Sequence, residues 1–217
     1  MSIRILSLDC ETTGCSANDQ IMQLAYIDVP NEISTLIKDF TEIGHGRNLL
    51  HLPKYAEYFK PDVPCHPEAF KVHGITHEMV ADCLHSEHAV LPSNCTHMIA
   101  HNAPFDYRML GKPDVKVICT VSLAKKIEKI RGEKFPCENY QLFTMFSAFY
   151  PELRDNFIRS RHDALTDCYM STLLLVALLK HFPFIKTIDG VYEYFFAEDV
   201  KKKKEKEVRA AAKLAKA

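Results

Sequence analysis

The chain has 217 residues, of which 47% are apolar and 25% charged, a composition typical of one globular domain and not of a disordered or fibrous chain. Its longest aliphatic run, residues 173–179, is much shorter than the roughly 20 residues that a membrane-spanning helix needs. The N-terminus lacks the basic segment, apolar core and cleavage site of a secretory signal. We therefore expect a cytoplasmic protein without a membrane segment.

The net charge of −1 is unevenly distributed along the chain. Residues 201–217 contain seven Lys and one Arg against two Glu, so this tail carries +6 and residues 1–200 carry −7. Such a basic tail either contacts nucleic-acid phosphates or is only a solvated surface. The sequence leaves both interpretations open.

The eight cysteines are scattered along the chain without a C-x-x-C pair. Several of them fall inside apolar runs, where a small thiol packs well. Cys65 adjoins His66, and Cys95 lies two residues from His97, but neither pair has the spacing of a zinc finger or ribbon. We expect reduced, structural cysteines and no zinc site.

The first third of the chain predicts strands followed by a loop. Three segments predict a meander of strands, with a hairpin turn at residues 30–31 between the last two: residues 3–8, 20–29 and 32–40. Residues 41–65, rich in His, Pro and Gly, predict a surface loop. Two short helices are expected next, at residues 66–72 and 76–84, the second with Thr76 as its N-cap.

The rest of the chain alternates strands with helices. Strands are predicted at residues 96–100 and 116–119, and helices at residues 104–110, 121–130, 140–149, 163–181 and from about 188 onward. The helix at 163–181 is the most apolar, and Asp163 is placed to cap it. The alternation indicates a layered α/β fold. We expect one domain at residues 1–183 and a helical segment with the basic tail at 184–217.

Two carboxylates follow the first predicted strand. Asp9 and Glu11 stand two residues apart, and strand side chains alternate, so both point to the same side. Holding two anions together where water is scarce is costly unless a cation neutralises them. A hard metal ion such as Mg²⁺ or Mn²⁺ suits these ligands. The alternative is a solvated start of a turn through Thr12, Thr13 and Gly14.

Two more acids stand at the beginnings of predicted helices. Asp106 lies in the first turn of the helix after strand 96–100, where it either joins the metal site or only favours the helix N-terminus. Asp167 lies one turn inside the apolar helix 163–181, where a buried carboxylate needs a partner. His162 precedes that helix, and an imidazole, whose unperturbed pKa is about 6.5, can accept a proton from water near neutral pH. A histidine between Arg161 and Asp163 can equally be a plain surface residue.

Three motifs, taken in order, resemble those of the DnaQ-like exonucleases of the DEDD superfamily. They are Asp-Cys-Glu-Thr-Thr-Gly at 9–14, His-Asn-Ala-Pro-Phe-Asp at 101–106 and His-Asp-Ala-Leu-Thr-Asp at 162–167. The histidine five residues before the last aspartate is similar to the histidine branch of the superfamily. The tyrosine branch would have Tyr where Asp163 stands. The likeness extends from about residue 3 to residue 180.

The resemblance implies a ribonuclease-H-like α/β fold with a mixed sheet of about five strands flanked by helices. It also implies a 3′-to-5′ exonuclease with two Mg²⁺ ions, replaceable by Mn²⁺, about 3.5 to 4 Å apart around the scissile phosphate. Asp9 would bridge both ions, Glu11 and Asp167 would complete one site, and Asp106 the other. His162 would be the general base, and nucleoside 5′-monophosphates would be released.

Substrate contacts are expected from residues near the acids: Thr12, Thr13, Gly14, Asn102 and Phe105. The expected partners are 3′ ends of nucleic acid, with DNA favoured over RNA. Three alternatives are an RNA 3′-end exonuclease, the proofreading subunit of a polymerase and an inactive nucleic-acid-binding module. The sequence does not determine whether a polymerase or a second copy of the chain binds.

Overall fold

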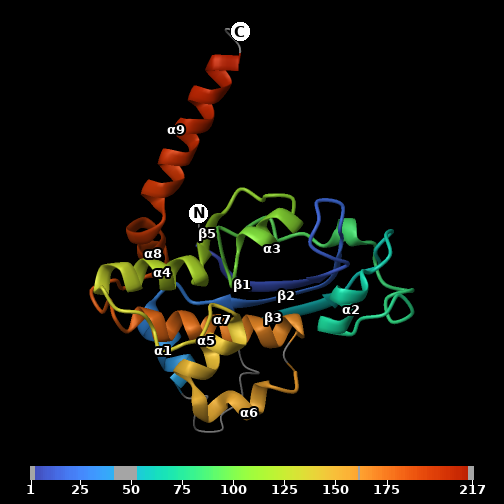
Figure 1. Ribbon diagram of the computed structural model, residues 1–217, viewed down its shortest axis with the longest axis horizontal. Helices are drawn as coiled ribbons and strands as arrows, with labels where there is room; N and C mark the ends of the chain where they lie inside the picture. The colour runs from blue at the N-terminus through green and yellow to red at the C-terminus, as the bar shows by residue number, and fades with distance from the viewer. Residues whose placement is uncertain (1–2, 42–52, 161, 215–217) are drawn as a thin grey trace.

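The computed structural model describes residues 3–41, 53–160 and 162–214 of the chain (Figure 1). Among them is a five-stranded sheet with the strand order β3-β2-β1-β4-β5. The strands are β1 (Ile5–Thr12), β2 (Ile21–Val29), β3 (Lys54–Tyr58), β4 (His97–Ala100) and β5 (Lys116–Cys119). β1 pairs antiparallel with β2 and parallel with β4. The predicted mixed sheet of the α/β class is confirmed.

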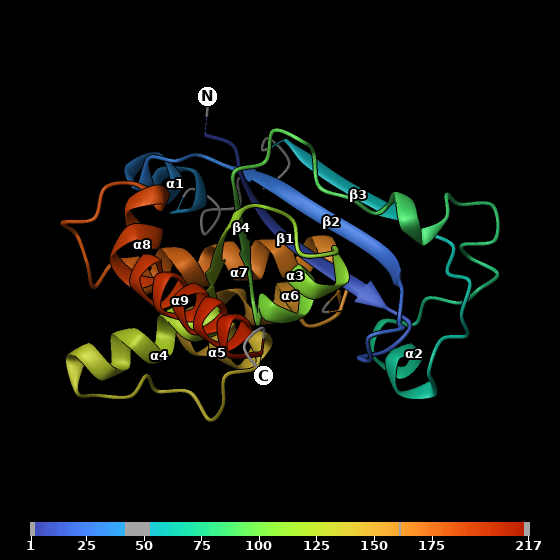
Figure 2. The same cartoon turned by 90° about the horizontal axis from the view of Figure 1, so that it is seen from above.

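Helices cover both faces of this sheet. They are α1 (Ile33–Thr41), α2 (Pro67–His73), α3 (Pro104–Met109), α4 (Thr120–Arg131), α5 (Leu142–Phe149), α6 (Arg154–Phe157), α7 (Ala164–Leu179), α8 (Ile188–Phe195) and α9 (Ala197–Leu214), with short 3₁₀ turns at Ser86–His88 and Pro151–Leu153. α7 and α5 lie under one face of the sheet and α3 over the other (Figure 1). The view from above shows α3 near the end of β1 (Figure 2).

The core is built around α7. Of its residues only Leu165 and Thr166 are not buried, and a helix that is apolar all round belongs inside a protein. It packs against β1 and β2 on one side and α5 on the other. The main apolar cluster also takes in residues of α1, α4 and α8. α7 is therefore firmly held along its whole length.

The predicted strand at residues 32–40 is wrong, because this segment forms the helix α1. Its apolar residues Ile33, Leu36 and Ile37 recur with helical spacing, and the first two are buried. The hairpin at residues 30–31 is wrong for the same reason. The third strand of the antiparallel part is β3, inside the segment predicted as a loop. β3 is mostly exposed and so lacks the alternation that would have revealed it; residues 42–52 of that segment lie outside the described residues.

The helix predicted at residues 76–84 is also wrong. The hydroxyl of Thr76 does accept the expected hydrogen bond from the Met79 N–H, at 3.2 Å. The following N–H groups of Ala81 and Cys83, however, bond to carbonyls three residues back, as in successive turns. The other predicted strands and helices form at their expected places with shifts at their ends. The largest shift is that β1 continues to Thr12, and the short helix α6 was not predicted.

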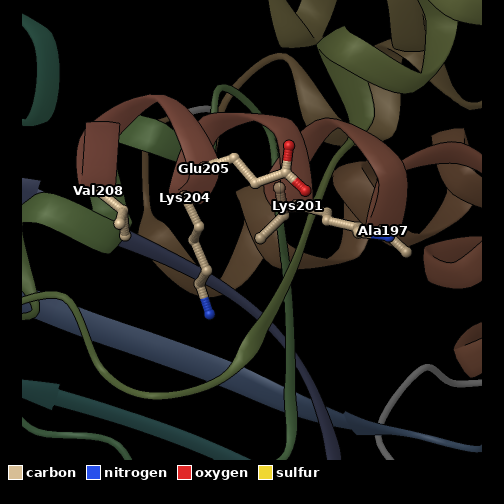
Figure 3. A pocket seen from close by; sticks show the side chains of 6 residues that line it. Ala197, Lys201, Lys204, Glu205 and Val208 are labelled. Atoms are coloured by element: carbon tan, nitrogen blue, oxygen red, sulfur yellow. The ribbon is translucent and has the colours of Figure 1, made fainter. Parts of the chain in front are cut away.

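The C-terminal segment divides into a packed and a projecting helix. α8 buries Ile188, Val191 and Phe195 in the main core. α9 then leaves the body of the molecule and extends into solvent (Figure 1), and its residues 201–208 are exposed. A shallow pocket lies along one side of α9, between Ala197 and Val208 (Figure 3). No helix among the described residues is long and apolar enough to cross a lipid bilayer.

Candidate active site

The strand β1 carries two of the predicted acids within its hydrogen-bonded ladder. Asp9 pairs with Ala25 and Glu11 with Gln23 on β2, and the register shifts directly after Glu11. Both carboxylates share the face of Ser7, whose hydroxyl donates to the Cys168 carbonyl of α7 at 3.3 Å. The two acids therefore point to the same side, as the sequence predicted from their spacing, and that side faces α7.

Asp167 meets them from the first turn of α7. The helix begins at Ala164, and its N-cap Asp163 accepts a hydrogen bond from the Thr166 N–H at 3.1 Å. This cap confirms the helix start expected from the sequence. Asp167 is 8% exposed and accepts the His162 N–H at 3.3 Å. The carboxylate is thus fixed in the buried part of the helix and faces the strand.

Asp106 arrives from the opposite face of the sheet. The pairing of β1 with β4 runs only from Ile5 to Ser7, so β4 offers no partner to Cys10. Instead, the carboxylate of Asp106 accepts hydrogen bonds from both the backbone N–H and the thiol of Cys10, each at 3.2 Å. Asp106 is only 2% exposed. Asp106 thereby fills the place beside Cys10 that β4 leaves open.

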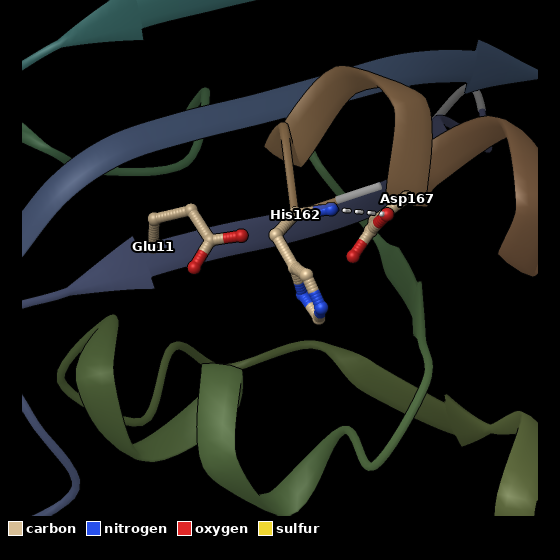
Figure 4. Close-up of side chains that lie close together, drawn as sticks. All are labelled: Glu11, His162 and Asp167. Atoms are coloured by element: carbon tan, nitrogen blue, oxygen red, sulfur yellow. Dashed lines mark hydrogen bonds between the residues drawn. The ribbon is translucent and has the colours of Figure 1, made fainter. Parts of the chain in front are cut away.

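His162 stands at the open side of the cluster. One side-chain atom each of Glu11, His162 and Asp167 lies within 4.8 Å of the others, and the imidazole is exposed (Figure 4). The backbone of His162 has φ of 66°, a left-handed conformation that is unfavourable for a residue with a side chain. Such strain persists where the surroundings impose it. Here it directs the N–H toward Asp167 and the imidazole toward the acids.

The electrostatics of the cluster favour a cation. Burial, together with the charges of the neighbouring acids, raises the pKa of Glu11 to about 8 and that of Asp9 well above its usual range. Burial is also the main cause that raises the pKa of Asp106 and of Asp167, each to about 7. Without a counter-ion, the ionised cluster therefore opposes folding.

The same carboxylates suit a divalent metal ion. Oxygen donors that converge at one edge are the ligands preferred by hard cations such as Mg²⁺ and Mn²⁺. No lysine or arginine forms an ion pair with any of the four acids among the described residues. A bound cation would supply the missing positive charge and lower the pKa of each ligand.

The loop after β1 places the predicted substrate residues beside the acids. Thr12 and Thr13 are buried, and their hydroxyls donate to the Gly14 carbonyl at 2.6 Å and to Asp19 at 2.9 Å. A Cβ on Gly14 would lie 2.5 Å from the His66 ring and 2.7 Å from Asp19, so a side chain there would force His66 or Asp19 to move. These residues shape the loop, and their contact with substrate stays a prediction.

Asn102 and Phe105 frame the beginning of α3. Asn102 is exposed and left-handed, with φ of 60°, which asparagine tolerates better than most residues. Phe105 is partly buried against the cluster that contains Cys10 and Phe59, and Arg108 lies 5.5 Å from its ring centroid. A role of either residue in substrate binding stays a prediction.

Three polar residues of the site were missed as functional candidates. His73 contacts the Thr12 carbonyl at 3.1 Å and accepts the Ile75 N–H, while His101 bridges Thr120 and the Tyr140 carbonyl, both at 2.8 Å. Gln23 is buried beside Glu11 and bonds to the N-terminus of α7. His101 begins the motif at 101–106 but received no role there, whereas His73 and Gln23 show their contacts only in the folded structure.

Comparison with known proteins identifies the family. Residues 6–175 match the family model described as RNase_T, exonuclease. The chain belongs to this exonuclease family. It is a DnaQ-like member of the DEDD superfamily, whose enzymes depend on divalent metal ions.

Individual relatives agree with this assignment. Exodeoxyribonuclease 10 of Escherichia coli K12 is 31% identical over 122 residues, which are 55% of this chain and 52% of that protein. The matched part thus spans about half the length of this relative. DNA polymerase III subunit epsilon of Rickettsia conorii is 27% identical over 82% of this chain and 74% of its own. The structure of exonuclease X with 5′-overhanging duplex DNA aligns with a TM-score of 0.56 and 25% identity, covering 82% of this chain and 92% of that one.

The raised pKa values predict how the metal-free protein responds to pH. The pKa values of these acids are higher in the folded than in the unfolded protein. The folded state is therefore most stable below about pH 4, where the acids are protonated, and loses stability as they ionise and the pH rises toward 8. With EDTA, the Tm of the wild type should therefore fall over this range, and Mn²⁺ should restore it at high pH. Asp167→Asn should raise the Tm in EDTA at pH 8 and weaken the response to Mn²⁺.

Thermal unfolding followed by circular dichroism measures these shifts. Asp155→Asn, a change at an exposed acid of α6, is the matched control and should leave both responses unchanged. A Tm in EDTA that is independent of pH, and that is equal in the wild type and Asp167→Asn, would contradict the electrostatic account.

Proposed function

We propose that this protein is a 3′-to-5′ exonuclease that hydrolyses terminal phosphodiester bonds of DNA and releases nucleoside 5′-monophosphates. The observation that carries the proposal is the convergence of Asp9, Glu11, Asp106 and Asp167 at one end of β1, with His162 beside them. Membership of the exonuclease family supports it. Because the matched part spans about half of the first relative, the activity is inferred from the site together with the family.

The reaction requires a water molecule to attack the terminal phosphorus. A bond forms between the water oxygen and phosphorus, the bond from phosphorus to the 3′ oxygen breaks, and the 3′ oxygen gains a proton. His162 is exposed and adjacent to the acids, so its imidazole can accept the proton that the water loses. Asp167 orients the segment that carries this imidazole through the His162 N–H.

The four carboxylates would hold two Mg²⁺ ions, for which Mn²⁺ can substitute. When bound, the ions would neutralise the phosphate and stabilise the charge on the leaving oxygen. Asp9 is central in the cluster and would be shared, Glu11 and Asp167 would hold one ion, and Asp106 the other. The converging oxygen donors and the raised carboxyl pKa values support this assignment.

DNA is the proposed substrate because the similar proteins are named for it. One is an exodeoxyribonuclease, and another was solved with duplex DNA. The likeness to a polymerase III epsilon subunit favours, as a second candidate, a proofreading subunit that works in a complex. Phe184 and Tyr194, more than half exposed with ring centroids 5.5 Å apart, form an apolar pair near α8 that suits a protein contact.

The basic helix α9 is proposed as an accessory contact for nucleic acid. Its four consecutive lysines, residues 201–204, surround the helix, because successive residues are about 100° apart. Only Lys202 of the four forms an ion pair within the described residues. The division into a catalytic domain at 1–183 and an appended segment at 184–217 also stays a proposal. Of the appended segment, α8 packs in the main core.

A nuclease assay tests the proposed function. We expect 5′-labelled DNA oligomers to shorten from the 3′ end with Mg²⁺ or Mn²⁺ and to stay intact with EDTA. Asp9→Asn should abolish the ladder, because it removes a central metal ligand but keeps the size of the side chain. Matched RNA oligomers measure the preference for the sugar. Tight DNA binding without cleavage would refute the enzyme and favour a binding module.

The role of His162 predicts a particular kinetic loss. His162→Asn keeps a residue that tolerates the left-handed backbone, so the fold and metal binding should survive. Loss of the general base should lower kcat by about 10²- to 10⁴-fold with little change in KM. Steady-state kinetics and the Tm check this result, with the exposed His88→Asn as control. An unchanged kcat would remove His162 from the mechanism.

Removal of the basic helix predicts a change in binding. Truncation of the chain after Val200 removes residues 201–208, all of which are exposed. The core should therefore remain intact. The slope of log Kd against log salt for duplex DNA should fall by about 0.9 for each phosphate that the lysines of α9 neutralise in the wild type, while kcat stays unchanged. Fluorescence anisotropy at several salt concentrations measures the slope. An identical slope would show that α9 is a solvated surface.

A further inference from the structure

The side chain of Gln23 links the sheet to the start of α7. Gln23 lies on β2 directly opposite Glu11 of β1 and is 4% exposed. Paired residues of neighbouring strands project to the same face, so its amide shares the face of Glu11 toward α7. A buried amide is costly unless both of its ends are hydrogen-bonded.

Both ends of this amide are used at the helix N-terminus. The Gln23 oxygen accepts the Ala164 N–H at 3.1 Å, and the Gln23 nitrogen donates to a carboxylate oxygen of Asp163 at 2.9 Å. The other oxygen of Asp163 accepts the N–H and the hydroxyl of Thr166, both at 3.1 Å. Gln23 and Asp163 therefore cap the helix jointly.

The polarity of these bonds determines which side chains can serve. A reversed amide would place its NH₂ group against the Ala164 N–H and its oxygen against the Asp163 carboxylate, two contacts between like groups. A glutamate at position 23 would repel Asp163, and a leucine would leave the Ala164 N–H without a partner. Beside Asp163, the site thus requires one donor and one acceptor at position 23.

This joint cap stands between two parts of the cluster. Asp163 directly follows His162, and Asp167 lies one turn further along α7. On the other side, Gln23 is the ladder partner of Glu11. The distances among Glu11, His162 and Asp167 thus depend on where α7 begins relative to β2.

We propose that Gln23 is a positioning residue for the active site, which sets the spacing of Glu11, His162 and Asp167 by anchoring the first turn of α7 to the sheet. The proposal deepens the proposed exonuclease function and rests on it for its kinetic effects. Its effect on metal binding, however, depends only on the geometry of the acids. A ligand displaced by about an ångström can cost on the order of 10²-fold in rate.

The test exchanges the amide and the carboxylate between positions 23 and 163. Gln23→Glu places two carboxylates against each other and should lower Mn²⁺ affinity by about 10- to 100-fold, as removal of a group that orients a ligand does. In the double variant Gln23→Glu/Asp163→Asn, the new amide donates to the carboxylate introduced at position 23, and its oxygen still accepts the Thr166 N–H. The pair keeps its total charge, so affinity and kcat should return to near the wild-type values.

A control separates positioning from stability. Thr172→Val removes a buried hydrogen bond to the Cys168 carbonyl, two turns deeper in α7. It should lower the Tm without changing kcat or Mn²⁺ affinity. Titration of Mn²⁺ by electron paramagnetic resonance, the Tm and single-turnover cleavage of a 5′-labelled DNA oligomer are measured for every variant.

The outcomes distinguish the two proposals. Wild-type Mn²⁺ affinity and kcat in Gln23→Glu would overturn the positioning role, as would a double variant no better than Gln23→Glu. Should the wild type bind Mn²⁺ but cleave neither DNA nor RNA, the exonuclease function fails. Loss of Mn²⁺ affinity in Gln23→Glu and its recovery in the double variant would still establish the anchor.

Discussion

The burial of four neighbouring carboxylates is the constraint on which the site depends. Asp9, Glu11, Asp106 and Asp167 are held where burial raises each pKa, so the metal-free arrangement opposes folding when the acids are ionised. The surrounding structure must offset that cost. The buried helix α7, which packs on β1 and β2, supplies apolar contact that contributes to this. A rigid core thus holds the four carboxylates in place.

The sequence predicts best where one local pattern determines the structure. The apolar run after Asp163 gives α7 and its cap, and the two-residue spacing of Asp9 and Glu11 gives their common face. Family motifs then join Asp106 and Asp167 to the pair, although these acids reach it from opposite faces of the sheet. Spacing alone could not have placed them together, because their approach depends on how β4 ends and how α7 packs.

The wrong predictions have the same physical origin. α1 is rich in β-branched residues, which favour a strand locally, but its apolar spacing fits a helix that packs on α7. β3 is an exposed edge strand that depends on pairing with β2 rather than on its own pattern. Gln23 is inconspicuous in a strand sequence, and its importance follows only from a contact about 140 residues away. Long-range pairing is the information that a single segment does not contain.

The fold places the four acids and the basic helix α9 in different parts of the molecule. Asp9 and Glu11 lie toward the carboxyl end of β1, whereas His97 and Lys116, at the starts of β4 and β5, bind Asp189 of α8. That network holds α8, and hence the root of α9, at the opposite end of the parallel strands. The root of α9 thus lies away from the four acids, and salt screens exposed charges beyond about 10 Å. The proposed contribution of α9 is therefore to the overall affinity for nucleic acid, whereas the reactive phosphate would depend on the metal ions proposed at the acids.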